Sequence, residues 1–290
     1  MEKIAVVTDS NSGITQKEAK GNLFVLPMPF IIDGSDYYED INLTQEEFYE
    51  KLKSDVKIST SQPSYGEVTE LWEKVLKDYD YIIHIPMSSG LSESCASSTR
   101  FAEEANFKGK VFVVNNQRIS VTQKASVYEA LDLIKQGKTA KEIKDYLEAS
   151  KMDSSIYITV ETLKYLKRGG RVTPAAAAIA TLLKIKPILQ IHGEKLDAFA
   201  KVMNMNQAKH RMIAAIKKDI EERFSDLSKE GKLALSVAYT DNYEAANKFK
   251  EEIMQEFPNM EILGVDPLSL SVSCHIGPGS LAIALARYKY

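Results

Sequence analysis

The sequence has few of the residues that define several common protein classes. Its 290 residues include only two cysteines, Cys95 and Cys274. Two thiols cannot form a four-cysteine zinc site or the dense disulfide framework of a small secreted domain. The four histidines are widely spaced and lack the i, i+4 pairing of a helical metal site. The sequence therefore predicts no metal site and no disulfide scaffold.

A charge excess of one sign and long apolar runs are also missing. Lys and Arg number 37 against 40 Asp and Glu, so the net charge is −3, which argues against a general nucleic-acid binder. No window approaches the roughly 20 apolar residues of a membrane span. The N-terminus is charged at once and has no apolar core of signal-peptide length. We expect a cytoplasmic protein without integral membrane association, with room for transient contact with a membrane surface.

The common nucleotide and hydrolase motifs are absent as well. The chain contains neither G-x-x-x-x-G-K-[ST] nor a strand-linked G-x-G-x-x-G, the loops whose glycines let backbone N–H groups close on phosphate. The nucleophile elbow G-x-S-x-G is also missing. The sequence therefore predicts no cofactor.

The first half of the chain alternates short apolar runs with longer amphipathic stretches. This pattern is typical of a mainly parallel sheet covered by helices, and it predicts an α/β fold. The expected strands cover residues 4–9, 23–32, 57–60, 81–86 and 111–115. Helix starts are marked by capping boxes, each a hydroxyl followed three residues later by a glutamate: Thr15 with Glu18, Thr44 with Glu47, Ser64 with Glu67, and Thr139 with Glu142.

A polar stretch near residue 150 predicts a boundary between two α/β domains, residues 1–152 and 153–290. In the second domain we expect a strand at 156–160, a helix ending at Gly169-Gly170, and an alanine-rich helix opened by Thr173-Pro174. A hairpin around His192-Gly193 comes next. A helix at 206–227, a strand at 233–239, a helix at 243–257 and a strand at 262–265 follow. The last segment is predicted to pack back on the interface between the domains.

Hydroxyl groups gather just past predicted strand ends, where open α/β sheets place their ligands. The three segments are residues 8–10 (TDS), 58–64 (ISTSQPS) and 88–92 (SSGLS). The last two lead into helices, so hydroxyls and backbone N–H groups would converge on an anion. Each hydroxyl alone is also explained as a helix cap. The number of hydroxyls in these clusters exceeds what capping needs.

Two further segments carry polar groups on glycine turns. Arg168 and Arg171 flank a glycine pair at a helix end, which suits either a phosphate or carboxylate contact or a helix stop with solvated cations. His275 precedes a rigid Gly-Pro-Gly turn. A lone histidine is more often structural than functional.

Taken together and in order, these segments resemble the DegV family of bacterial fatty-acid-binding proteins. The segments are those at 8–10, 58–64 and 88–92, with LKRGGRV at 166–172, LKIKPIL at 183–189 and HIGPG at 275–279. The resemblance implies two α/β domains that hold one long-chain fatty acid, such as palmitate, stearate or oleate, between them. For members of the fatty-acid-kinase B type it implies no chemistry by the chain itself. The carboxylate is presented to a separate kinase subunit, which uses ATP to form an acyl phosphate for phospholipid synthesis.

The resemblance also implies roles for particular residues. Thr60 and Ser92, with Ser61 and His275 beside them, would bind the carboxylate. Arg168 and Arg171 would serve phosphate binding or kinase docking. The sequence departs from the family pattern at Glu93-Ser94-Cys95, where a Gly-Thr-Tyr run is common, and at residues 115–117, where an Asp-Ser pair is common. The first departure puts a carboxylate close to the expected head group.

The acyl chain needs an apolar tunnel, for which the sequence offers candidates. They are the alanine-rich stretch at 175–183, Phe30, Phe199 and Met203. The alanine-rich stretch is equally explained by close packing of a helix on a sheet, and aromatic and Met residues such as the other three more often belong to ordinary core. Two other functions compete with a lipid carrier. One is a serine acyl hydrolase or transferase with Ser92 as nucleophile and His275 as base. The other is a binding module for a different small anion.

Overall fold

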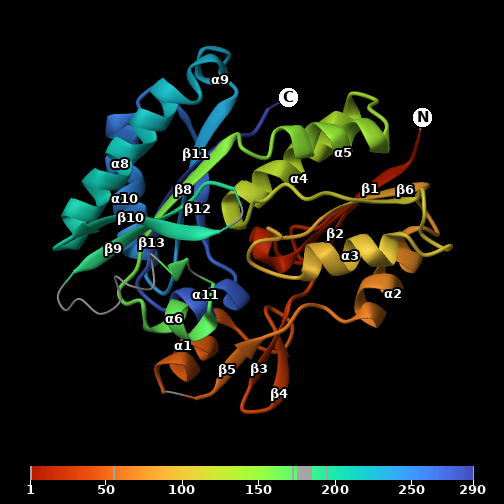
Figure 1. Ribbon diagram of the computed structural model, residues 1–290, viewed down its shortest axis with the longest axis horizontal. Coiled ribbons are helices and arrows are strands. Elements are labelled where there is room, and N and C mark those ends of the chain that lie inside the picture. The colour runs from red at the N-terminus through yellow and green to blue at the C-terminus, as the bar shows by residue number, and fades with distance from the viewer. Residues whose placement is uncertain (1, 55, 172, 175–184, 194, 290) are drawn as a thin grey trace.

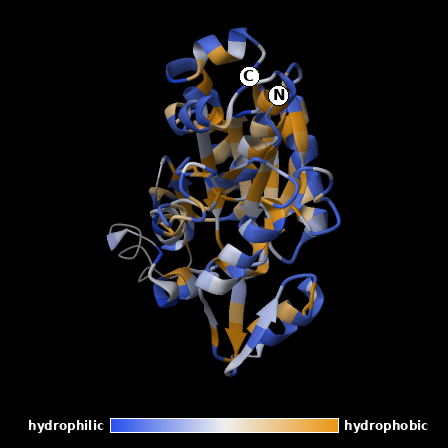
Figure 2. Ribbon diagram, turned by 90° about the vertical axis from the view of Figure 1, so that its right-hand side faces the viewer, coloured by the Kyte–Doolittle hydropathy of each residue, from blue (hydrophilic) through white to orange (hydrophobic). Residues whose placement is uncertain are grey.

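The computed structural model describes residues 2–54, 56–171, 173–174, 185–193 and 195–289 (Figure 1). The α/β fold class predicted from the sequence is confirmed. The alanine-rich helix expected after Pro174 falls outside the described residues. Apolar residues concentrate on the strands and on the inward faces of the helices, while the outer faces of the helices are hydrophilic (Figure 2).

The N-terminal part contains a four-stranded sheet in which all strands are parallel. Its order is β2-β1-β6-β7, with β1 at Ile4–Asp9, β2 at Leu23–Leu26, β6 at Tyr81–Ile85 and β7 at Val111–Val113. Helices α2 (Tyr65–Val75) and α3 (Ser94–Ala102) cover one face, and α4 (Ser120–Lys135) and α5 (Ala140–Ala149) cover the other (Figure 1). Burial of both faces explains why these strands are continuous apolar runs.

The strand expected over residues 23–32 is wrong in its extent, because two prolines interrupt it. Pro27 and Pro29 have no N–H to donate, so β2 stops at Leu26 and a separate strand β3 (Pro29–Ile32) begins. This strand pairs antiparallel with β4 (Ser35–Tyr38) and with β5 (Ile58–Thr60) in a small third sheet. Residues 57–60, expected in the parallel sheet, therefore belong to this small sheet, which packs on α1 (Gln45–Lys53).

Three of the four predicted capping boxes begin helices. Thr44, Ser64 and Thr139 each accept a hydrogen bond from the backbone N–H three residues on, and each glutamate returns the contact. Thr15 makes the same exchange with Glu18, but only turns follow it. Gly21 at φ 64° turns the chain into β2 shortly afterwards, so no helix has room to form.

The C-terminal part contains a six-stranded mixed sheet of order β10-β9-β8-β13-β11-β12. Its strands are β8 (Ser154–Thr159), β9 (Lys186–Ile191), β10 (Leu196–Val202), β11 (Leu233–Tyr239), β12 (Glu261–Pro267) and β13 (Leu281–Arg287). The hairpin predicted around His192 is confirmed as β9 and β10. Helices α8 (Met205–Glu222) and α10 (Tyr243–Glu256) cover the outer face, and the helix expected over 206–227 is split into α8 and the short α9 (Ser225–Lys229).

Sequence reasoning did not identify β13, which lies at the centre of this sheet. It pairs antiparallel with β8 on one side and with β11 on the other. Among the described residues, all strands before residue 154 belong to the parallel sheet or to the small β4-β3-β5 sheet, and all later strands belong to the six-stranded sheet. This change of sheet lies near the predicted boundary, and the division into residues 1–152 and 153–290 stays a prediction.

Helix α4 is a layer shared by the two parts. It packs against β1 and β6 on one side and against β13, β11 and β8 on the other (Figure 1). A buried ion network adds to this contact: Arg118 lies 3.6 Å from Glu129, and Arg287 on β13 lies 3.8 Å from the same carboxylate. Burial raises the pKa of Glu129 to about 7, while the two arginines act in the opposite direction. The two parts are therefore held together by the packing of α4 on both sheets as well as by the covalent connection of the chain.

Among the described residues, no helix combines the length and apolar character needed to cross a bilayer. Within the same residues, no group of three or more His, Cys, Asp or Glu side chains is arranged to hold a metal ion.

Candidate functional site

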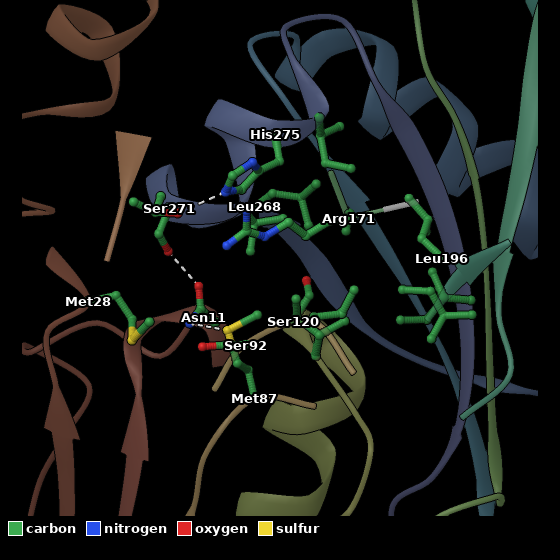
Figure 3. A pocket seen from close by; sticks show the side chains of 18 of the residues that line it. Asn11, Met28, Met87, Ser92, Ser120, Arg171, Leu196, Leu268, Ser271 and His275 are labelled. Atoms are coloured by element: carbon green, nitrogen blue, oxygen red, sulfur yellow. Dashed lines mark hydrogen bonds between the residues drawn. The ribbon is translucent and has the colours of Figure 1, made fainter. Parts of the chain in front are cut away.

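A cavity of about 300 Å³ lies between the N-terminal part and the inner face of the C-terminal sheet. Its walls come from the inner face of that sheet, the start of α4, the loops after β5 and β6, and two short helices, α6 (Lys164–Gly169) and α11 (Leu270–Ile276). Figure 3 shows side chains from both parts of the chain converging on this space. This volume is at the lower end of the range for small-molecule pockets.

Strand β13 explains why there is space beneath the sheet. Its side chains alternate, so Leu281, Ile283 and Leu285 pack under α8 and α10 on the outer face. Ala282 and Ala284 point the other way and line the cavity. Small side chains on one face and large ones on the other leave a hollow on the inner side alone.

The remaining wall of the cavity is mainly apolar. Ile156 and Ile158 of β8 lie beside the two alanines through the strand pairing, and Ile191 and Leu196 of the hairpin extend the same surface. Ala238 of β11 pairs with Ala282 in the same wall. The opposite wall and the ends include Met28, Met87, Leu91, Ile119, Val121, Leu166, Leu268, Val272 and Ile276. Such a lining favours an extended apolar ligand.

The polar groups of the cavity include a hydrogen bond between the two parts of the chain. The hydroxyl of Thr60, at the end of β5, lies 2.9 Å from Nε2 of His275 on α11. Burial, with a smaller effect of the Arg171 cation, lowers the pKa of His275 to about 4. The imidazole is therefore neutral at pH 7, with one ring nitrogen as donor and the other as acceptor.

The other residues predicted for the carboxylate also line the cavity. The hydroxyl of Ser92 lies 2.8 Å from that of Ser94 and accepts a hydrogen bond from the backbone N–H of Ser94. Ser61 is exposed, and its hydroxyl donates to the carbonyl of Gln62. The structure thus brings Thr60, Ser61, Ser92 and His275 to one cavity from three separate segments.

The two arginines occupy different positions. Arg171 lines the cavity, and its Nη1 donates to the carbonyl of Gly169 at 2.5 Å. Figure 3 shows its guanidinium close to His275. Arg168 is exposed near the end of α6 and is not among the described residues that line the cavity. Glu93, where the sequence departs from the family pattern, is exposed and lies in the lining.

The segment at residues 8–10 contributes differently from the expectation. Asp9 is buried and accepts hydrogen bonds from the backbone N–H groups of Met87 and Asn11, and burial raises its pKa. It thereby holds the loop after β6 in place. Residues 8–10 are not among the described residues that line the cavity, whereas Asn11, which follows them, is.

Sequence reasoning missed the polar contact that Asn11 makes across the two parts. Its Oδ1 accepts a hydrogen bond from Ser271 on α11 at 2.5 Å, and its Nδ2 lies 3.0 Å from the sulfur of Met87 (Figure 3). Ser120, at the start of α4, also lines the cavity and has φ 55°. No local pattern marks these residues, because they meet only through tertiary packing.

The tunnel residues proposed from the sequence are wrong wherever the structure describes them. Phe30 packs in the core between the small sheet and α1. Phe199 lies on the outer face of the C-terminal sheet, with its ring 4.7 Å from that of Tyr157. Met203 is 63% exposed. Residues 175–183 lie outside the described residues. The alternation in LAIALAR at 281–287 was the available signal for the wall that the structure shows.

Comparison with known proteins agrees with this architecture. A family model described as "Uncharacterised protein, DegV family" matches residues 3–287. The chain belongs to the DegV family. The resemblance drawn from the six sequence segments is thereby confirmed. Protein DegV of Bacillus subtilis is 31% identical over 284 residues, which are 97% of this chain and 98% of that protein. A DegV domain-containing protein of Clostridium perfringens is 31% identical over 290 residues, with 98% and 97% covered.

Solved DegV structures share the fold over the whole chain. DegV of Bacillus subtilis, described as a fatty acid binding protein, superposes with a TM-score of 0.84 and 28% identity, covering 99% of this chain and 100% of that one. A DegV family protein of Thermus thermophilus, described by its fatty acid binding, superposes with a TM-score of 0.87 and 24% identity, covering 98% and 99%. A stearic acid-binding protein of Eubacterium ventriosum has a TM-score of 0.87 at 20% identity, with 99% of each chain covered.

The geometry does not support the serine-nucleophile interpretation. Among the described residues, the hydroxyl of Ser92 has Ser94 as its partner, whereas Nε2 of His275 faces Thr60. A nucleophilic serine needs its base within hydrogen-bond reach. The interpretation as a small-anion module is also disfavoured, because most of the cavity wall is apolar.

Proposed function

We propose that this DegV family chain binds one long-chain fatty acid, such as palmitate, stearate or oleate, in the cavity. The acyl chain would lie against β8 and β13, and the carboxylate would lie at the polar groups. The observation that carries the proposal is that one cavity combines an extended apolar wall with a cluster of hydroxyls, imidazole and guanidinium. The fatty acids bound by related DegV proteins support it.

The energetics favour such a ligand. Transfer of ~14 methylene groups from water at roughly 0.8 kcal/mol each gives about 11 kcal/mol. This gain is comparable to the estimated cost of association, so a modest further contribution from the head group yields useful affinity. Burial of the acyl chain would therefore supply most of the affinity, and the polar groups would orient the acid.

We propose that Thr60, Ser61, Ser92 and His275 bind the carboxylate. With His275 neutral, an Nε2–H donated to the Thr60 oxygen leaves the Thr60 hydroxyl free to donate to the ligand. Hydrogen bonds from neutral hydroxyls stabilise a carboxylate without burying a fixed ion pair. Arg171, at the edge of this group, would supply positive charge for the acid or for its phosphorylated product.

We further propose that the chain itself is not an enzyme and acts as the lipid-binding subunit of a cytoplasmic fatty-acid kinase system. A separate kinase subunit would bring ATP and form the acyl phosphate used in phospholipid synthesis. Arg168 and Arg171 would serve phosphate binding or docking of that subunit. Both side chains are exposed and Arg171 lines the cavity, which supports this role.

The direct test is organic extraction of the purified protein followed by mass spectrometry. A protein of similar size from the same host, treated identically, sets the lipid background. Near-stoichiometric long-chain fatty acid is the expected result, and it would also show the preferred chain length. A folded preparation that contains no lipid above background and takes up no added palmitate or oleate would refute the proposal.

A further inference from the structure

The glycine pair in the LKRGGRV segment has two different physical explanations. Gly170 ends α6 with φ 66°, a left-handed conformation that favours glycine, and a Cβ built on it would meet nothing within 4 Å. Gly169 is the last residue of α6 and shows no such backbone requirement. The absence of a side chain at Gly169 therefore needs another cause.

That cause is the imidazole of His275. A Cβ built on Gly169 would lie 2.1 Å from Nδ1 and 3.0 Å from Cε1 of this ring. Atoms in folded proteins do not pack this closely. Any residue other than glycine at this position would therefore have to displace the ring or separate α6 from α11.

The opposite edge of the same ring contacts Thr60. Nε2 of His275 lies 2.9 Å from the Thr60 hydroxyl, so the imidazole is held between β5 and the backbone of α6. A ring pushed away from Gly169 would change the geometry of this hydrogen bond. Through the His275 ring, the contact with Gly169 thus affects the Thr60 hydroxyl, which we predict binds the carboxylate.

Gly169 also contacts the cation of the site. Its carbonyl accepts a hydrogen bond from Nη1 of Arg171 at 2.5 Å. Figure 3 shows Arg171 and His275 close together in the cavity. One backbone unit therefore touches both the imidazole and the guanidinium that line this space.

A second contact of the same kind joins the two helices. A Cβ on Gly277, which follows α11, would lie 2.3 Å from Cδ2 of Tyr165 on α6. Close approach of α6 and α11 thus depends on a glycine from each side. The position of the His275 ring therefore depends on how closely α6 and α11 pack, as well as on the rotamer of His275.

We propose that Gly169 is a positioning residue: its bare Cα seats the His275 imidazole against Thr60, and its carbonyl holds Arg171 beside it. The consequence for ligand affinity rests on the function proposed above. The placement of the ring does not depend on that function.

The test is Gly169→Ala, with Gly66→Ala as the matched control. Both glycines lie in helices, and a Cβ on Gly66 of α2 would meet nothing within 4 Å. We expect Gly169→Ala to weaken palmitate binding by about 10-fold, the effect of one disturbed hydrogen bond. It should also shift the ¹⁵N resonances of the His275 ring in ligand-free protein. Gly66→Ala should change neither.

A double-mutant cycle separates positioning from general damage. In a His275→Ala background the space beside residue 169 is open, so adding Gly169→Ala should cause no further loss of affinity and should restore any stability that the single variant lost. An equal loss in both backgrounds would overturn the proposal. Unchanged His275 resonances in Gly169→Ala would also overturn it. Absence of palmitate binding in every variant, with shifted ring resonances, would refute the proposed function and leave the positioning role standing.

Discussion

Replacing Ala284 with leucine tests whether the hollow under β13 holds an acyl chain. Ala284 is 2% exposed, lies in the cavity wall and pairs with Ile156 across the sheet. It lies two residues, or about 7 Å, farther along β13 than Ala282, and β13 begins shortly after His275 in the sequence. The added leucine carbons would take space that we assign to the far part of a long chain.

The magnitude follows from displaced methylene groups. Leucine exceeds alanine by about three carbons, and each displaced methylene group forgoes about 0.8 kcal/mol. The expected loss is about 2.4 kcal/mol, or roughly 50-fold in affinity, for the longest acids that the wild-type protein binds. An acid shorter by a few carbons should lose much less, because it does not reach the substituted position. The variant should therefore change chain-length preference and not merely weaken binding.

Displacement of a fluorescent fatty acid by a series of unlabelled acids measures this change. Ala214→Leu is the matched control, because Ala214 is exposed on α8 and is not among the described residues that line the cavity. Thermal unfolding tests whether the space beside Ala284 is already filled by protein atoms. If it is, the added leucine would be too large for it and would lower the free energy of unfolding by about 1–3 kcal/mol. A uniform loss for all chain lengths, or a free energy of unfolding lowered by that amount with unchanged affinity, would refute the assignment of this space to the ligand.

Three further predictions concern the polar groups and the buried histidine. The double variant Thr60→Ala, Ser92→Ala should fold normally and bind palmitate more weakly by a few kcal/mol at most, since hydrogen bonds to a carboxylate contribute about 1.5–3 kcal/mol each; calorimetry that finds wild-type affinity would remove both residues from the site. Arg171→Ala should weaken binding of the ionised acid at low salt by up to about 5-fold, while Arg168→Ala, outside the described lining, should not; an equal effect of the two variants in the same titration would contradict this distinction. Burial lowers the pKa of His84 from 6.5 to about 3, so the unfolded state binds more protons below pH 6.5 and the free energy of unfolding falls as the pH falls. In urea unfolding, His84→Leu should therefore gain about 2 kcal/mol relative to wild type between pH 8 and pH 5, and a gain independent of pH would show that His84 is not the cause.

Local sequence patterns predicted much of the secondary structure. Short apolar runs between amphipathic stretches predicted the positions of β1, β6, β8 and β11. Pairs of a hydroxyl residue and a glutamate predicted three helix starts. They failed where the outcome depended on partners distant in sequence. Residues 57–60 have the composition of any short strand, and only the prolines before β3 and the pairing with it decide which sheet they join.

The candidate site was accessible from the sequence only in part. Thr60, Ser92 and His275 carry recognisable motifs, and the structure places them in the same cavity. Their hydrogen-bond partners and the apolar wall could not be read in this way, because an alanine facing a cavity looks the same as an alanine packed in a core. Asn11 and Ser271 meet across 260 residues of sequence, which no local pattern records.

The position of β13 has a consequence for when the cavity can form. The parallel sheet is complete in sequence by residue 113, but β8 and β11 are joined only by a strand that ends at Arg287. During synthesis the first sheet can fold while the second still lacks its central strand. The cavity wall that holds Ala282 and Ala284 therefore comes into existence only after residue 287 leaves the ribosome. On the function proposed above, a chain that ends before β13 should therefore retain no fatty acid, and retention of the acid would report that β13 had been made.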